Sequence, residues 1–329
     1  MEGRIEIQAS VNKAGRRLFF LIVVLNLLLT TVTIPKKCRR CCPSRTNTMT
    51  SNKSVLITGC SDGGIGSALA IVFQQAGYRV FATARNPEKM QNLKDLSNLT
   101  LLTLDVTDST HISAAVEAVS RETDGNLTYL INNAGRNHFM PILDEDIDAA
   151  KRIYETNVWG PVAITKAFAP LLIKAKGTIV FTTSISGYVN VPYMGVYGAS
   201  KRSIEIIAET LRLEMAPFHV NVLSVVTGAV KTNGQTYFQD WKLPEDSLYK
   251  PIEDTIHKRT RGADGVKRME LMEYATKVVH EIVGGHTGKF WYGNNAGGVK
   301  FGSTYLPSSM MDSGVVKGTG LDVLAKQRL

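Results

Sequence analysis

Residues 56–69, LITGCSDGGIGSAL, decide the fold of this chain. An apolar run typical of a β-strand gives way there to a glycine-rich turn and then to a helical pattern. The helical period is plain, because apolar residues recur at 65, 68, 69, 72, 73 and 76 before Gly77. Such a turn offers backbone N–H groups and a helix N-terminus to a pyrophosphate. Tight packing of a strand against a helix also requires glycine, so the turn alone assigns no function.

The same alternation of strand and helix continues along the chain. Strand-like runs occur at 54–58, 79–84, 99–104, 127–131, 177–183, 219–226 and 289–292, with helical patterns between most of them. This order predicts an α/β, doubly wound (Rossmann) fold with a parallel seven-stranded sheet and helices on both faces. The polar region 233–285, with one helix near 268–283, is predicted to be a substrate lid in a domain spanning 51–329. Residues 301–329 give no assignment.

Residues 1–50 form an N-terminal extension with its own character. The uncharged apolar run 18–34 has basic residues on both sides and predicts an uncleaved membrane-anchor helix, followed by a linker. We expect association with the endoplasmic reticulum or lipid droplets, with the catalytic domain in the cytosol. If Met49 is the true start, the protein is cytosolic. Cys38, Cys41 and Cys42 are either acylated or inert reduced thiols.

The charge and the cysteines narrow the classes of partner. The net charge of +9 is concentrated in residues 1–50, which hold nine Lys or Arg and two Asp or Glu. The remainder is close to neutral, so nothing predicts a nucleic-acid partner. The four cysteines and six histidines show no metal-binding spacing, and no disulfide framework is indicated.

The motif VYGASK places Tyr197 and Lys201 four residues apart, on one face of a predicted helix. An ammonium beside a phenol favours the phenolate, so we expect Lys201 to lower the pKa of Tyr197. Ser184 ends the strand-like run GTIVFTTS, where its hydroxyl can hydrogen-bond a substrate carbonyl. An exposed tyrosine and a solvated lysine would give the same spacing in isolation.

Taken in order, the motifs resemble the short-chain dehydrogenase/reductase family in its compact single-domain form, across residues 54–292. They are the glycine turn at 58–66, Asp105 in LDVT, NNAG at 132–135, Asn157 in TNVWG, Ser184, and YGASK at 197–201. The resemblance implies that Tyr197 is the general acid/base. It implies that Lys201 both holds the nicotinamide ribose and tunes Tyr197. It also implies that Ser184 polarises the carbonyl and that Asn157 holds a water.

The resemblance also implies a set of cofactor-binding residues: Gly59, Ser61, Gly64, Ile65, Gly66, Asp105, Asn133, Ala134, Gly135, Tyr197, Lys201 and Thr232. Two features depart from the family pattern. Four residues instead of three separate Gly59 from Gly64, so we expect Gly63 to absorb the extra residue at positive φ and Asp62 to point to solvent. Thr227-Gly228 stands where the family has Pro-Gly.

The end of the second strand-like run, RVFATARN, bears on the choice of cofactor. A carboxylate there would accept the ribose 2′-OH of NAD, whereas this chain has Arg85, whose guanidinium can hold a 2′-phosphate. NADP(H) is therefore the expected cofactor, although an exposed arginine without a ligand fits the same residue.

Within the family, 171–187 and 211–232 resemble the fungal NADPH-dependent 1-acyldihydroxyacetone-phosphate reductases. That resemblance implies reduction of a ketone on a hydrophobic substrate, and a membrane lipid as partner of the anchor. The alternatives are a reductase of a polyketide, terpenoid or steroid-like ketone, and a non-catalytic dinucleotide-binding protein. Members of the family often pair through the helices that here carry Asn157 and Tyr197, so the resemblance allows a homodimer, and the N-terminal anchor leaves the oligomeric state open.

Overall fold

The computed structural model describes residues 53–327, except for the side chains of 235–237. The predicted anchor, its three cysteines and most of the predicted linker lie outside the described residues. The described chain is built on one sheet of seven parallel strands in the order β3-β2-β1-β4-β5-β6-β7. The strands are β1 (Ser54–Thr58), β2 (Arg79–Ala84), β3 (Leu99–Thr103), β4 (Tyr129–Asn132), β5 (Thr178–Ser184), β6 (Asn221–Thr227) and β7 (Gly288–Tyr292). The doubly wound prediction is confirmed.

The strand order reverses at β1, and this reversal positions the site. β1 pairs with β2 on one side and with β4 on the other, with Leu56 opposite Phe81 and Leu130. The chain therefore winds away from β1 in both directions, which opens a crevice beyond the carboxyl ends of β1 and β4. The glycine turn follows β1, so it lies at that crevice.

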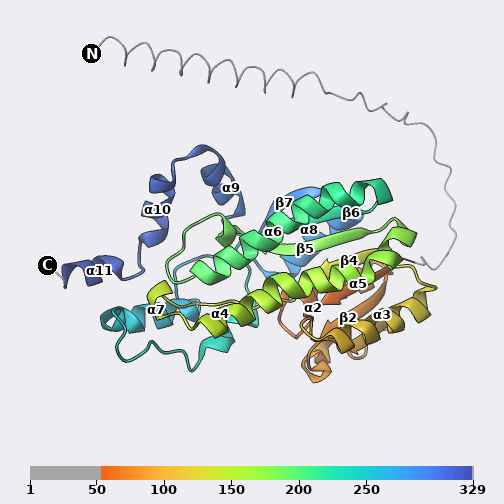
Figure 1. Ribbon diagram of the computed structural model, residues 1–329, viewed down its shortest axis with the longest axis horizontal. Helices are drawn as coiled ribbons and strands as arrows, with labels where there is room; N and C mark the ends of the chain where they lie inside the picture. Colours follow the sequence, from red (N-terminus) through yellow and green to blue (C-terminus); the bar gives the residue numbers. More distant parts are fainter. Residues whose placement is uncertain (1–52, 328–329) are drawn as a thin grey trace, which may run out of the picture. The chain divides into compact units, whose positions relative to one another are not determined.

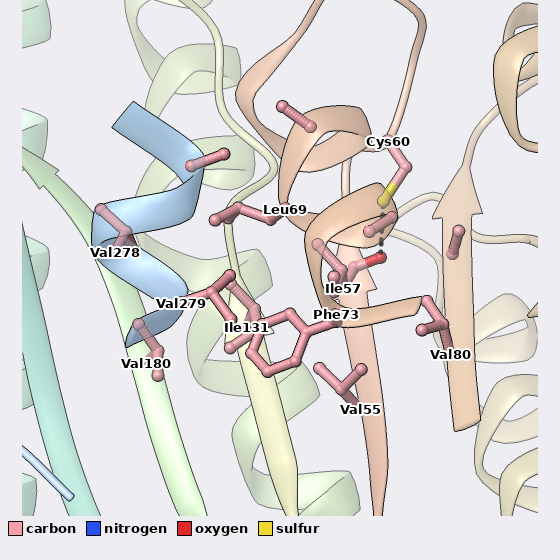
Figure 2. Close-up of a cluster of buried hydrophobic side chains, with 14 of the residues drawn as sticks. Val55, Ile57, Cys60, Leu69, Phe73, Val80, Ile131, Val180, Val278 and Val279 are labelled. Carbon is pink, nitrogen blue, oxygen red and sulfur yellow. Dashed lines mark hydrogen bonds between the residues drawn. The ribbon is translucent and has the colours of Figure 1, made fainter. Parts of the chain in front are cut away.

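Helices cover both faces of the sheet, because alternate strand residues point to opposite faces. Val55 and Ile57 of β1 pack in a cluster with α2 (Ile65–Gln75) and α8 (Leu271–Val283), whereas Leu56 packs in a second cluster on the other face. That second cluster includes side chains of α3 (Ser109–Thr123), α5 (Gly160–Ala175) and α6 (Gly195–Met215). Figure 2 shows Phe73 and Leu69 of α2 beside Val279 and Val278 of α8 in the first cluster.

The longest apolar helix is a core element. α4 (Ile147–Tyr154), the π-helical turn η4 (Glu155–Trp159) and α5 run on without a break. Among residues 53–327 this stretch, 147–175, is long and apolar enough to span a bilayer. Ile164 and Phe168 are fully buried against the sheet, however, so its hydrophobicity is explained by core packing.

The region predicted as a lid divides into two parts. η7 (Asn233–Phe238), η8 (Lys250–Ile252) and α7 (Glu253–Thr260) lie over the end of the sheet, and they pack in a small cluster with Phe139 and Tyr193. α8 instead belongs to the helical layer, because Tyr274, Val278 and Ile282 are buried there. The predicted lid therefore extends too far: its periodic segment 271–283 is a core helix.

Three further helices follow β7, and all but the start of the first lie in residues 301–329, which the sequence left unassigned. They are α9 (Ala296–Tyr305), α10 (Ser308–Val316) and α11 (Leu321–Lys326). Figure 1 shows this blue C-terminal run at the same end of the sheet as α7. The substrate side of the crevice is therefore bordered by both the 233–260 insertion and the C-terminal helices.

Candidate active site

The turn after β1 contains the extra residue that the spacing predicts. Gly59 has φ +75° and Gly63 has φ +70°, so both glycines occupy backbone conformations that side-chain-bearing residues disfavour. The inserted segment reaches toward β2, because Cys60 N donates to Thr83 O (2.8 Å) and Asp62 N donates to Lys89 O (2.8 Å). The prediction that Gly63 absorbs the insertion is thus confirmed.

Asp62 does not point to solvent as expected. Its carboxylate accepts hydrogen bonds from the backbone N–H groups of Gln91 (2.8 Å) and Asn92 (3.1 Å). These groups open the turn η2 (Gln91–Leu93), whose first N–H groups need acceptors. Asp62, which also lines the cleft described below, therefore fastens the glycine turn to the segment after β2, and both of its carboxylate oxygens accept backbone hydrogen bonds there.

The NNAG motif joins β4 to the end of β1. Asn133 N and Ala134 N both donate to Thr58 Oγ1, at 3.0 and 2.9 Å, and Asn133 Nδ2 donates to Gly59 O at 3.1 Å. A Cβ on Gly66 would lie 2.4 Å from Gly59 O, so only glycine lets α2 approach this closely. The motif thus holds the two strands at the crevice in register.

A single cleft of about 1200 Å³ lies beyond the carboxyl ends of the strands. It brings together most of the predicted site residues: Gly59, Ser61, Gly64, Ile65, Arg85, Asp105, Asn133, Ala134, Gly135, Ser184, Tyr197, Lys201 and Thr232. Two predicted residues do not line it. Gly66 acts through the packing described above, and Asn157 lies behind the cleft wall.

Asn157 is buried in η4, and its amide is fully engaged. Its Oδ1 accepts from Arg136 N (2.8 Å), and its Nδ2 donates to Arg136 O (2.9 Å) and Ser200 Oγ (3.0 Å). A π-helical turn at this position is common near functional sites, because it re-aims one side chain. The side chain fixes the backbone that follows NNAG, and the predicted water-holding role stays a prediction.

Tyr197 and Lys201 lie one helical turn apart on α6, as the spacing predicts. The Lys201 ammonium lies 6.0 Å from the centroid of the Tyr197 ring and donates to Thr182 O at 2.9 Å. Ser184, at the end of β5, forms a hydrogen bond with the Tyr197 hydroxyl. The three side chains that the family resemblance assigns to catalysis therefore line the same cleft.

The electrostatics of this group differ from the expectation. Burial raises the pKa of Tyr197, and only the hydrogen bond with Ser184 opposes that shift. Burial also lowers the pKa of Lys201 to about 8. The expected lowering of the Tyr197 pKa by Lys201 is therefore wrong for the protein without ligands, because removal of the phenol from water raises its pKa, and the Ser184 hydrogen bond rather than Lys201 opposes that rise. Tyr197 is held in its protonated form at neutral pH.

Asp105 and Thr232 line the cleft with their side chains already bonded within their own turns. Asp105 Oδ1 accepts from Thr107 N (3.0 Å) and from Thr107 Oγ1 (2.8 Å). Thr232 Oγ1 accepts from Gly234 N at 3.4 Å and begins η7, and Asn233 N donates to Gly63 O at 3.1 Å. The start of the 233–260 insertion is thereby tied to the glycine turn.

The residues that face this cleft fit a dinucleotide phosphate. No described side chain caps α2, so the first N–H groups of that helix lie open beside Gly64 and Ile65, which line the cleft. A side pocket of about 320 Å³ is lined by Ser61, Arg85, Asn86 and Lys89. Two cations and a hydroxyl suit the additional phosphate of NADP(H).

Lys89 was missed in the sequence, although it follows Arg85 by four residues. That spacing predicts proximity only on a helix, whereas these residues meet across a 3-10 turn, η1 (Pro87–Lys89).

The second departure from the family pattern, Thr227-Gly228 in place of Pro-Gly, has a packing explanation. Thr227 Oγ1 lies 2.7 Å from the hydroxyl of Tyr274 in α8, a bond that proline could not make.

Comparison with known proteins agrees with this geometry. Residues 53–243 match the family model for short chain dehydrogenases. The chain is 46% identical over 244 residues to the short-chain dehydrogenase PC-15 of Penicillium crustosum, covering 74% of this chain and 89% of that protein. It is 40% identical over 240 residues to the NADPH-dependent 1-acyldihydroxyacetone phosphate reductase of Schizosaccharomyces pombe, covering 72% of this chain and 80% of that protein.

The fold is similar to that of a solved short-chain dehydrogenase from Streptomyces avermitilis. The TM-score is 0.67 at 24% identity, and the match covers 86% of this chain and 100% of that one. The Rossmann fold, the family match and the ordered motifs at one cleft agree, and the chain belongs to the short-chain dehydrogenase/reductase family of oxidoreductases.

Proposed function

We propose that this protein catalyses the NADPH-dependent reduction of a ketone to a secondary alcohol on a hydrophobic substrate. One observation carries the proposal: Ser184, Tyr197 and Lys201 face the same cleft as the open N-terminus of α2 and the Arg85–Lys89 pocket. The NADPH dependence named for the Schizosaccharomyces pombe relative supports the choice of cofactor. When bound, NADPH supplies the hydride for the carbonyl carbon.

The side chains of the cleft supply the proton. Tyr197 donates its hydroxyl proton to the carbonyl oxygen as negative charge develops there, and the hydrogen bond from Ser184 orients that oxygen. The raised pKa of Tyr197 keeps the donor protonated before reaction. Lys201, with its pKa lowered to about 8 by burial, is mostly protonated at pH 7 and stabilises the phenolate that forms.

The walls of the cleft favour an apolar substrate. Apolar side chains from three segments line it, namely Val189, Val191, Met194, Val299, Met310, Met311 and Val315. An acyl-dihydroxyacetone-phosphate lipid fits this lining and agrees with the name of the Schizosaccharomyces pombe relative. A polyketide, terpenoid or steroid-like ketone fits the apolar walls equally well and is the second candidate. Membrane association through residues 18–34 remains part of the proposal for the lipid substrate.

The test is turnover by the full 329-residue chain with NADPH or NADH. The substrates are a long-chain 1-acyldihydroxyacetone phosphate and an uncharged polycyclic ketone, with the alcohol identified by mass spectrometry. We expect NADPH consumption coupled to formation of a secondary alcohol from at least one of them. Binding of NADPH without turnover on any ketone would support the non-catalytic alternative instead.

Replacing Arg85 by alanine is expected to weaken the use of NADPH selectively. Loss of a charge-assisted bond to phosphate corresponds to a rise of roughly tenfold or more in KM for NADPH. KM for NADH should stay unchanged, because that cofactor has no 2′-phosphate. The control is Lys94→Ala, which removes an exposed cation outside the side pocket. Equal increases in both KM values for Arg85→Ala would argue against the pocket.

The predicted homodimer has one supporting feature. Ile206 and Leu213, seven residues apart on α6, are 55% and 65% exposed. This spacing places both side chains on one face of the helix, as an interface would require. The dimer remains a prediction from the family resemblance.

A further inference from the structure

The substrate end of the cleft is built by the insertion and the C-terminal helices together. α10 contributes Met310, Met311 and Val315 to the lining, and Lys317 follows that helix on the same wall. α10 is packed against α9, because a Cβ on Gly302 would lie 2.3 Å from the Met311 sulfur. Methionine side chains adapt to varied apolar shapes, so this wall suits a flexible hydrocarbon chain.

A cation lies beside this apolar wall. Arg259, in the last turn of α7, lines the cleft, and its Nη1 donates to Gly318 O at 3.2 Å. Because Gly318 directly follows Lys317, this bond places the Arg259 guanidinium next to the segment that carries Lys317. Tyr193, in the loop before α6 and four residues before Tyr197, lies in the same neighbourhood, because its hydroxyl donates to Thr319 O at 3.0 Å, one residue beyond Gly318. Burial raises the pKa of Tyr193 to about 12, and the charge of Arg259 opposes part of that rise.

The guanidinium of Arg259 is only partly satisfied. Its Nε is buried and has no hydrogen-bond partner among residues 53–327. A buried donor without an acceptor is unfavourable. The Nε is closed off from solvent, so a ligand would meet the guanidinium at the part that lines the cleft. The neighbouring Arg268 differs, because its guanidinium pairs with both carboxylate oxygens of Asp264 at 3.0 and 2.8 Å. Arg259, unlike Arg268, therefore keeps bonding capacity for a ligand.

We propose that Arg259, assisted by Lys317, binds an anionic group of the substrate, while Met310, Met311 and Val315 bind its apolar chain. The substrate is then an amphiphilic ketone that carries a phosphate or a carboxylate. This inference rests on the proposed reductase function and narrows its substrate class. The planar guanidinium suits both anions, since it can donate two parallel hydrogen bonds to either.

The first experiment measures binding directly, so it holds even if no ketone is turned over. Wild type and Arg259→Gln, as full chains, are titrated with a long-chain 1-acylglycerol 3-phosphate and with the matching uncharged 1-acylglycerol. We expect Arg259→Gln to weaken binding of the phosphate by roughly tenfold or more and to leave the uncharged lipid unaffected. A fatty acid and its methyl ester form a second pair, which separates carboxylate from phosphate recognition.

The second experiment uses turnover. KM for an anionic acyl ketone should rise in Arg259→Gln while kcat stays unchanged, and Arg259→Lys should recover part of the loss. Arg261→Gln is the matched control, because Arg261 is exposed two residues farther on and does not line the cleft. If Arg259→Gln folds poorly, Arg259→Lys and the binding pairs still decide the question.

The possible results separate this inference from the proposed function. Equal weakening of charged and uncharged ligands would make Arg259 a structural tie between α7 and residue 318, and would overturn the inference. The inference would also be overturned if wild type bound the charged and the uncharged ligand of each pair with equal affinity. Absence of any ketone reduction, with selective loss of anion binding, would instead contradict the reductase proposal and uphold the anion site.

Discussion

The variant Tyr197→Phe is expected to lose ketone reduction almost completely while retaining the cofactor. Phenylalanine keeps the ring on α6 but removes the only proton that the site offers to the carbonyl oxygen in our proposal. Loss of a positioned general acid lowers kcat by about 10³-fold. Affinity for NADPH should be unchanged, because the open N-terminus of α2 and the Arg85–Lys89 pocket are intact. The measurements are steady-state kcat and equilibrium binding of NADPH.

Tyr129→Phe provides the matched control for that variant. Tyr129 begins β4 and is buried, with its pKa raised to about 12, but it does not line the cleft. Removing its hydroxyl should leave kcat unchanged. Retained activity in Tyr197→Phe would show that another group donates the proton, and the catalytic assignment would then be wrong.

Replacing Glu205 by alanine is expected to cause the largest loss of stability. This carboxylate on α6 is only 1% exposed and accepts from Arg202 Nη1 (2.9 Å), Lys289 Nζ (3.0 Å) and the Tyr188 hydroxyl. Its removal leaves Arg202 and the Tyr188 hydroxyl without this acceptor, and Lys289 with the Tyr188 hydroxyl in place of the carboxylate. Removal of one partner from a buried ion pair typically costs about 3 kcal/mol or more. Because Arg202 and Lys289 are partly exposed, we expect a loss of about 3 kcal/mol in the free energy of unfolding.

Urea unfolding of the full chain measures this loss. Glu214→Ala is the control, because Glu214 lies on the same helix but is exposed. We expect that variant to unfold within about 0.5 kcal/mol of wild type. If Glu205→Ala were as stable as Glu214→Ala, the interactions of Glu205 would contribute nothing to the attachment of α6 to β7. Glu205→Gln should fall between them, since its amide keeps one acceptor oxygen.

The sequence by itself determined the sheet, the glycine turn and the grouping of the catalytic side chains. These features depend on contacts that are local or periodic. The pattern of 65, 68, 69, 72 and 73 sets the buried face of α2, and the four-residue spacing of Tyr197 and Lys201 sets their common face. Positive φ at Gly63 followed from one extra residue in a short turn, because only glycine adopts that conformation without strain.

The tertiary structure alone decided the surroundings of those residues. Lys89 joins Arg85, Asp62 bonds to residues 91 and 92, and Asn157 holds the backbone of Arg136, all through contacts between segments that no local pattern encodes. The segment 271–283 is as amphipathic as a lid helix would be, and only its partner α2 shows that it is core. Burial raises the pKa of Tyr197. That burial comes from every segment that covers the side chain, including segments far away in the chain, so the local sequence did not reveal it.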